Sequence, residues 1–281
     1  MIITLRFSPR EILCAGVFLY GTLLPTVSYP AAIESTECKQ VIPSTADIDL
    51  SEAETSKLQT EWKRAIDQDK ASDLWRLLAD VDANRIDVKS TNDKGKTALM
   101  AAVKIGDQCL LAELLHRGLG ISDKGYTGGT TLMYAVLGND SGMIEIVLSR
   151  EPELDAQSTN GWTAVMIAAA KGFKDSMQQL FAAGADINLP DVYQWTPLMR
   201  AIDNRHSSVV NYLLSLPIEV NQVNENGSTA LHIAAQAGDE AAVAKLLELG
   251  SVVTVADKNG FTAVDVAVEN GYSEIAELIR R

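Results

Sequence analysis

The chain has 281 residues, of which 47% are hydrophobic and 22% charged, so it can bury a sizeable core and does not have the composition of a disordered protein. Its formal charge is −13 without any run of Lys and Arg, which disfavours nucleic acid and anionic membrane surfaces as partners. The three cysteines form neither a C-x-x-C pair nor a cluster with histidine at metal spacing, which argues against a structural zinc site and a disulfide scaffold.

Residues 1–32 have the order of a secretory signal peptide. Arg6 and Arg10 precede an uncharged apolar stretch, residues 12–24, and small or polar residues follow it. This stretch is shorter than the roughly 20 residues that a membrane-spanning helix needs. We therefore expect cleavage between residues 28 and 32 and export of the remainder, which would be periplasmic or secreted. An uncleaved membrane anchor is the alternative.

Two segments separate this peptide from the regular part of the chain. Residues 33–57 are polar and acidic and lack an apolar period, which predicts a linker. Residues 58–92 contain Thr60, Ala65 and the pair Leu77–Leu78 at the internal spacing of the units that follow, but they lack the turn glycine. These residues are predicted to form a degenerate repeat that caps the N-terminal end of an array.

Residues 93–281 repeat with a period of 33. A threonine opens each of six apolar segments, an alanine follows five residues later, and a glycine lies two residues before the threonine in five of the six units. The threonines are Thr97, Thr130, Thr163, Thr196, Thr229 and Thr262, and the alanines are Ala102, Ala135, Ala168, Ala201, Ala234 and Ala267. Paired apolar residues further along, such as Leu114 and Leu115, predict a second helix. Each unit is expected to contain two helices joined by turns.

These columns have structural explanations. A threonine oxygen can cap the first helix by accepting a bond from an otherwise unpaired backbone N–H. The small alanine lets neighbouring helices approach closely. Methionine occupies the third position after the first four threonines (Met100, Met133, Met166 and Met199), and we expect it to pack in the core, with an oxidation-sensitive ladder as the alternative.

The pattern resembles the ankyrin repeat, a 33-residue unit with T-P-L-H-x-A at its first helix and a G-A-D-x-N turn after its second helix. The best matches are residues 196–201 (TPLMRA), 229–234 (TALHIA) and 184–188 (GADIN). The resemblance implies an all-α fold, an ankyrin-repeat α-solenoid of six in-phase repeats plus the degenerate N-terminal capping repeat. The family prefers histidine where this chain has its methionines, and only His232 keeps it.

The sequence contains no recognisable catalytic, cofactor-binding or metal-binding motif. His116, His206 and His232 share no local acid–base or metal-ligand spacing. Residues 125–129 (GYTGG) lack the Lys of a phosphate-binding loop. We therefore expect a protein that is not an enzyme and holds no cofactor.

The resemblance also implies a binding surface, formed by the turn tips and the exposed side of the first helices along a concave face. Aromatic residues are concentrated at the tips of units two to four, and Trp and Tyr are frequent in interface hot spots. The expected partner-binding residues are Tyr126, Trp162, Tyr193 and Trp195, surrounded by Lys171, Asp203 and Asn204. Packing of these rings against the adjacent turn is the alternative.

These observations predict a monomeric, exported, non-catalytic module that binds a protein partner. An inhibitor or accessory subunit of an exported enzyme is one alternative, and a scaffold tethered by an uncleaved N-terminus is another. After cleavage only Cys38 and Cys109 remain. We expect both thiols to be free, because Cys109 lies near the start of a predicted helix and Cys38 in the linker; a disulfide in an oxidising compartment is the alternative.

Overall fold

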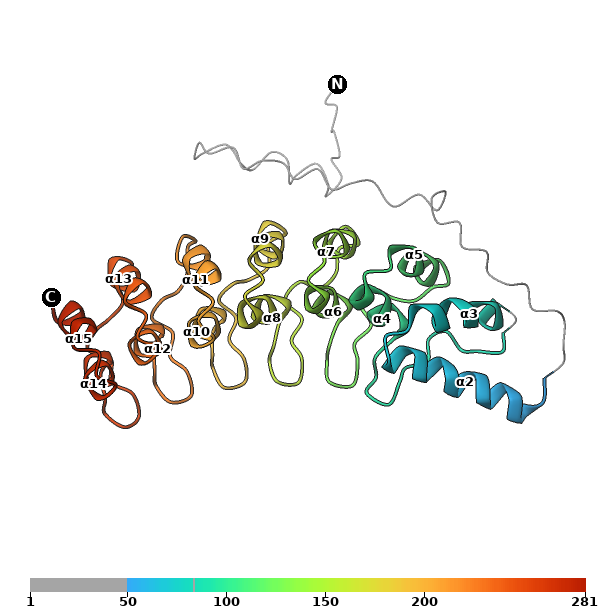
Figure 1. Ribbon diagram of the computed structural model, residues 1–281, viewed down its shortest axis with the longest axis horizontal. Coiled ribbons are helices and arrows are strands. Elements are labelled where there is room, and N and C mark those ends of the chain that lie inside the picture. Colours follow the sequence, from blue (N-terminus) through green and yellow to red (C-terminus); the bar gives the residue numbers. More distant parts are fainter. Residues whose placement is uncertain (1–49, 83) are drawn as a thin grey trace, which may run out of the picture. The chain divides into compact units, whose positions relative to one another are not determined.

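The computed structural model describes residues 50–82 and 84–281, which belong to one compact unit. The predicted signal peptide, its cleavage site and residues 33–49 of the predicted linker lie outside the described residues. Within the described part, the regular structure consists of fourteen α-helices, which follow one another as seven pairs, and of isolated β-bridges in the loops (Figure 1).

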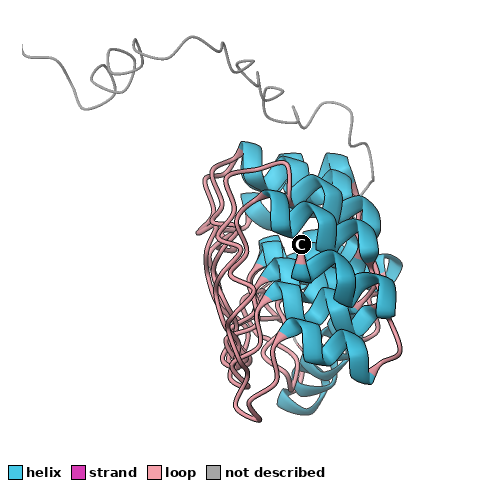
Figure 2. Cartoon of the chain, turned by 90° about the vertical axis from the view of Figure 1, so that its left-hand side faces the viewer, coloured by secondary structure: helices cyan, strands magenta, loops and turns pink. Residues whose placement is uncertain are grey.

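The first helices of the pairs are α2 (Glu52–Asp67), α4 (Ala98–Ile105), α6 (Thr131–Gly138), α8 (Ala164–Lys171), α10 (Pro197–Asp203), α12 (Ala230–Ala237) and α14 (Ala263–Glu269). The second helices are α3 (Ala71–Asp82), α5 (Gln108–His116), α7 (Ser141–Leu148), α9 (Lys174–Ala182), α11 (Ser207–Leu213), α13 (Glu240–Glu248) and α15 (Ser273–Arg280). Each second helix packs on its own first helix, and neighbouring first helices from α4 to α14 contact one another. The loops gather on one side of this row (Figure 2). The prediction of an all-α solenoid is confirmed.

The threonine column begins the first helices, as predicted. In five units the threonine Oγ1 accepts a hydrogen bond from the backbone N–H three residues later, at distances from 3.1 to 3.4 Å. In the remaining unit Nδ1 of His232 lies 2.9 Å from Oγ1 of Thr229 and accepts the Thr229 backbone N–H at 3.2 Å. A cap of this kind contributes about 1 kcal/mol to helix stability.

The alanine and methionine columns lie in the core. All six alanines are fully buried, which fits the close approach of neighbouring first helices. Met100, Met133, Met166 and Met199 have exposed fractions of 3% or less. Packing in the core therefore explains the methionine column. The four side chains are too buried to form a surface ladder that oxidants could reach.

The N-terminal helix differs from the prediction in its start. α2 begins at Glu52, so residues 52–57 of the predicted linker are helical. Ser51 caps the helix, and Glu54 returns a bond to the Ser51 backbone N–H at 2.9 Å, which is a capping box. Thr60 lies inside the helix and donates its hydroxyl to the Ser56 carbonyl, so it does not take the place of the threonine column. The first half of α2 is exposed, and for that reason it has no apolar period to detect.

The N-terminal pair contains two tryptophans, and one of them bonds to the next pair. The side chain of Trp62 is fully buried, and Trp75 donates its indole N–H to the Asp107 carboxylate at 2.8 Å. Asp107 also caps α5 through the Leu110 N–H. This contact joins the atypical first pair to the regular array.

Cys109, the second residue of α5, is disulfide-bonded. Our expectation of a free thiol is wrong for this residue. Its position in the first turn of α5 leaves the side chain only partly buried, so the helix does not prevent the bond.

Candidate partner-binding surface

The loops that lead into the first helices project from the row as fingers (Figures 1 and 2). We name each finger after the helix that follows it: the α6 finger is residues 117–130, the α8 finger 149–163, the α10 finger 183–196 and the α12 finger 214–229. Backbone hydrogen bonds of 2.8 to 3.2 Å join neighbouring tips. They run from Thr159 N–H to Thr127, from Val192 N–H to Asn160 and from Glu225 N–H to Tyr193. The tips are therefore fixed relative to one another.

A polar side chain closes the turn inside most fingers. In the α10 finger, Oδ1 of Asp191 accepts the backbone N–H groups of Tyr193 and Trp195, both at 2.9 Å. The same role falls to Asn92, Ser158, Asn224 and Asp257. The sequence reasoning missed this column, although its members recur at multiples of 33 residues.

A glycine is required where two fingers touch. Gly161 has φ +76°, and a Cβ atom there would lie only 2.6 Å from the backbone nitrogen of Val192. In the next finger Gln194 takes the place of the glycine and has φ 60°, a conformation that costs an L-residue about 1 kcal/mol or more. At this turn position the α10 finger therefore carries backbone strain that Gly161 and Gly227 avoid in the α8 and α12 fingers.

Arg200 of α10 lies against the tryptophans of two fingers. Its guanidinium carbon is 4.5 Å from the ring centroid of Trp195 and 5.6 Å from that of Trp162, which places it in cation–π contact with both. The guanidinium also pairs with the fully buried carboxylate of Asp191, with 2.5 Å between Nη2 and Oδ2. We call these four residues, Asp191, Arg200, Trp162 and Trp195, the Trp–Arg cluster.

The family of the chain follows from this repeated architecture and from comparison with known families. A family model described as ankyrin repeats (3 copies) matches residues 64–158, 132–224 and 216–280. The chain belongs to the ankyrin-repeat family. No curated protein matches it. Ankyrin repeats generally mediate protein–protein interaction and are typically non-catalytic.

The partner-binding residues expected from the sequence lie in two places on the ankyrin array. Tyr126 and Tyr193 are at finger tips, with exposed fractions of 73% and 51%. Trp162 and Trp195 are partly buried, because each packs on Arg200. The three polar residues are exposed at the C-terminal ends of first helices: Lys171 ends α8, Asp203 ends α10 and Asn204 follows it.

Two residues of this surface were missed. Arg200 was seen only as part of the TPLMRA match, yet it connects the two tryptophans. Val192 is 53% exposed beside Tyr193. The signal for Val192 was its place at a finger tip in the 33-residue period, whereas the contact of Arg200 with Trp162 has no local sequence signal.

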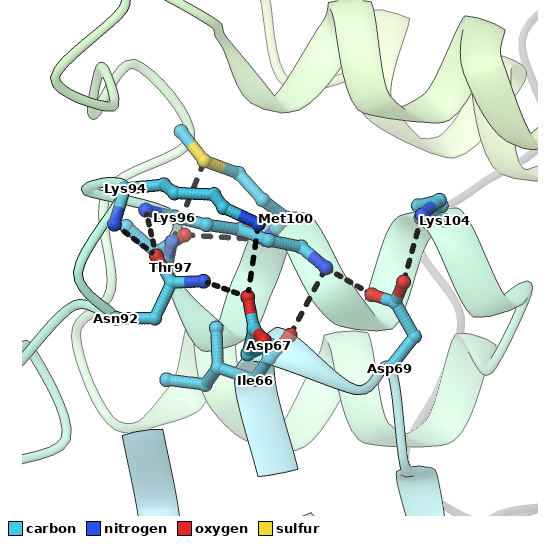
Figure 3. Close-up of polar contacts among 9 residues, drawn as sticks. All are labelled: Ile66, Asp67, Asp69, Asn92, Lys94, Lys96, Thr97, Met100 and Lys104. Carbon is cyan, nitrogen blue, oxygen red and sulfur yellow. Dashed lines mark hydrogen bonds and ion pairs between the residues drawn. The ribbon is translucent and has the colours of Figure 1, made fainter. Parts of the chain in front are cut away.

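Lys96, immediately before Thr97, is buried and makes structural contacts (Figure 3). Its Nζ pairs with Asp69 and donates to the Ile66 carbonyl at 3.0 Å. Lys104 pairs with the other oxygen of Asp69 at 2.7 Å. Burial by itself would raise the pKa of Asp69, but the hydrogen bonds from Lys104 and Lys96 lower it below its ordinary value. This ion-pair cluster joins α2 to α4 and is unlike the aromatic tips further along.

His206, which is partly buried, and His232, which is buried, both lie against backbone carbonyls. Nε2 of His206 lies 3.0 Å from the Ala170 carbonyl, and Nε2 of His232 lies 3.2 Å from the Phe261 carbonyl. Burial lowers the pKa of His232. Between residues 50 and 281, leaving aside residue 83, no group of three or more His, Cys, Asp or Glu side chains could hold a metal ion. None of the described helices combines the length and the apolar character needed to cross a bilayer.

Proposed function

We propose that this ankyrin-repeat chain is an exported protein-interaction module that does no chemistry and, as a monomer, binds a protein partner through its finger tips and first helices. The observation that carries the proposal is the exposure of Tyr126 and Tyr193 on fingers whose relative positions are fixed by backbone hydrogen bonds. Tyrosine and tryptophan supply a large contact area at a low cost in side-chain entropy, and they are enriched in interface hot spots.

Two observations support export. The first is the order of basic residues, apolar stretch and small residues at the N-terminus of the sequence. The second is the disulfide bond of Cys109, because disulfides form and persist in oxidising compartments and are rare in the cytosol. Removal of a signal peptide would eliminate Cys14, and Cys38 would then be the other cysteine of the exported sequence.

The non-catalytic part of the proposal rests on family membership and on the state of the candidate groups. His206 and His232 are each within bonding distance of a backbone carbonyl, which leaves them poorly placed as acids or bases toward a substrate. An inhibitor or accessory subunit of an exported enzyme would use the same surface. A membrane-tethered scaffold would require that residues 12–24 stay attached as an anchor.

The test of export is fractionation of the native protein followed by N-terminal sequencing. The proposal predicts a first residue between positions 29 and 33 in the exported fraction. A native protein that fractionates with the cytosol and retains residues 1–10 contradicts it, and an exported, membrane-bound protein that retains them supports the tethered scaffold. Peptide mapping without reduction should find a Cys38–Cys109 linkage; two free thiols would remove this support.

The test of the surface is affinity capture from the native compartment with three forms of the full chain. The Tyr193→Ala protein should lose the partner that the wild type captures. The control is Tyr272→Ala, because Tyr272 is 36% exposed but immediately precedes α15, the second helix of the last pair, away from the finger tips. Equal capture by the Tyr193→Ala protein would refute the proposed surface. A captured enzyme whose activity falls on binding favours the inhibitor alternative.

A further inference from the structure

The three middle fingers differ from their neighbours in charge. We define the tip of each finger as the two residues four and three positions before the threonine. The tips of the α6, α8 and α10 fingers are uncharged, whereas the flanking tips carry charged side chains. The middle tips are Tyr126–Thr127, Thr159–Asn160 and Val192–Tyr193, and the charged residues of the flanking tips are Asp93, Lys94, Glu225 and Lys258.

Two of the charged side chains near these tips, Arg200 and Lys124, are paired within the protein. Arg200 is neutralised by Asp191, whose carboxylate is fully buried and also accepts two backbone N–H groups. Lys124 pairs with Glu153 across the α6 and α8 fingers at 2.8 Å. Lys171 and Asp203 lie at the far ends of α8 and α10, about 10 Å along each helix from the fingers. The middle tips themselves are therefore uncharged on a chain with a net charge of −13, and the exposed carboxylate of Asp123 lies three residues before Tyr126.

This arrangement fits the core of a protein interface. Such cores are depleted of charged residues and enriched in Trp, Tyr and Arg, while charges remain at the rim. A partner's charged group placed over the middle tips would lose water without gaining a counter-ion, which is costly. An apolar or aromatic group would instead bury its surface against Val192, Tyr193 and Tyr126.

The guanidinium of Arg200 adds a polar feature of the same kind. One of its amino groups bonds Asp191, and its Nε has no acceptor among the described residues. This Nε is buried and out of a partner's reach, and because the pair with Asp191 is already neutral, the guanidinium attracts a second carboxylate only weakly.

From these observations, and resting on the proposed function, we infer that the α6, α8 and α10 fingers bind an uncharged, apolar segment of the partner protein. The flanking charged tips form the rim of this contact. Basic or acidic partner segments are excluded from its centre.

The experiment uses a phage-displayed random peptide library as the probe and the full chain as the immobilised target. Peptides enriched on the wild type are tested against two variants, Val192→Asp and Val252→Asp. The two valines have similar exposed fractions, 53% and 46%, but Val252 lies in the loop after α13, outside the middle fingers. The same charge is thus added at the proposed site and at a matched control.

We expect the enriched peptides to be poor in charged residues relative to the library. Their affinity should fall at least about tenfold on Val192→Asp and less than about twofold on Val252→Asp. It should change little between about 0.05 M and about 0.5 M NaCl, since unscreened charge attraction would weaken strongly over that range.

The outcomes separate this inference from the proposed function. Charged peptides that lose binding on Val192→Asp overturn the inference but keep the fingers as the binding surface. Peptides that bind the Val192→Asp protein as well as the wild type place the binding elsewhere and count against both. The inference is also overturned if selection on the wild type enriches no peptides beyond those that selection on the Val192→Asp protein enriches.

Discussion

The pair formed by Arg200 and Asp191 can be tested with a double-mutant cycle, using Arg200→Met and Asp191→Asn. Met keeps much of the aliphatic bulk between the two tryptophans but removes the charge. It leaves the Asp191 carboxylate, whose side chain is fully buried, without its counter-ion. Removing one member of a buried pair costs about 3–5 kcal/mol, and the two backbone N–H bonds that Asp191 keeps place the expected loss near about 3 kcal/mol.

The Asp191→Asn substitution should cost less, about 1–2 kcal/mol. The amide oxygen still accepts both backbone N–H groups, and Arg200, with 20% of its side chain exposed, can be partly hydrated. In the double variant no buried charge remains, so the loss should again be about 1–2 kcal/mol, far below the sum of the single losses. Urea titration followed by circular dichroism measures the free energy of unfolding of all four proteins. Additive losses would refute the reasoning that Asp191 depends on Arg200.

Three further predictions concern the fingers and the N-terminal junction. Trp195→Ala should weaken partner binding by about 2 kcal/mol or more but lower the unfolding free energy by only about 1 kcal/mol, because the ring is only partly buried on Arg200. Leu198 is 1% exposed, so Leu198→Ala should lower the unfolding free energy by about 2–5 kcal/mol. Titration of the partner measures the first effect, and thermal melts measure the second. A Trp195→Ala protein that melts early but binds normally once folded would show that the ring only packs. Gln194→Gly should raise the unfolding free energy by about 1 kcal/mol, because it relieves the φ of 60°, and an unchanged urea midpoint would mean that the strain is absorbed elsewhere. The pKa of Asp69 is lowered in the folded state, so the stability that its carboxylate contributes is present above its ordinary pKa of about 3.9 and is lost as the pH falls through the folded-state pKa. Asp69→Asn should therefore make the unfolding free energy depend less on pH below about pH 4. An unchanged pH dependence would contradict this assignment.

The sequence by itself determined the repeat and the starts of the regular first helices. Thr163, for example, bonds the backbone N–H only three residues further on, so its role depends on the local chain and recurs wherever the local pattern recurs. The burial of Ala168 follows in the same way from its fixed distance along the helix from that cap. At the N-terminus a local signal is also present, in Ser51 and Glu54, but the exposed start of α2 has no apolar period that would mark it as helical.

Only the tertiary structure decided which side chains of different repeats meet. Trp162 and Arg200 are far apart in the chain. Their contact depends on how the α8 and α10 fingers pack together, and the close approach of the backbone at Gly161 and Val192 determines this packing. Lys96 immediately precedes its threonine, as Trp162 does, yet it is buried because the Ile66 carbonyl of α2 and Asp69 of the following turn lie beside it. The position of a residue in the repeat determines whether it lies in a helix or a turn. The burial of its side chain and the partners of that side chain depend on the neighbouring repeat.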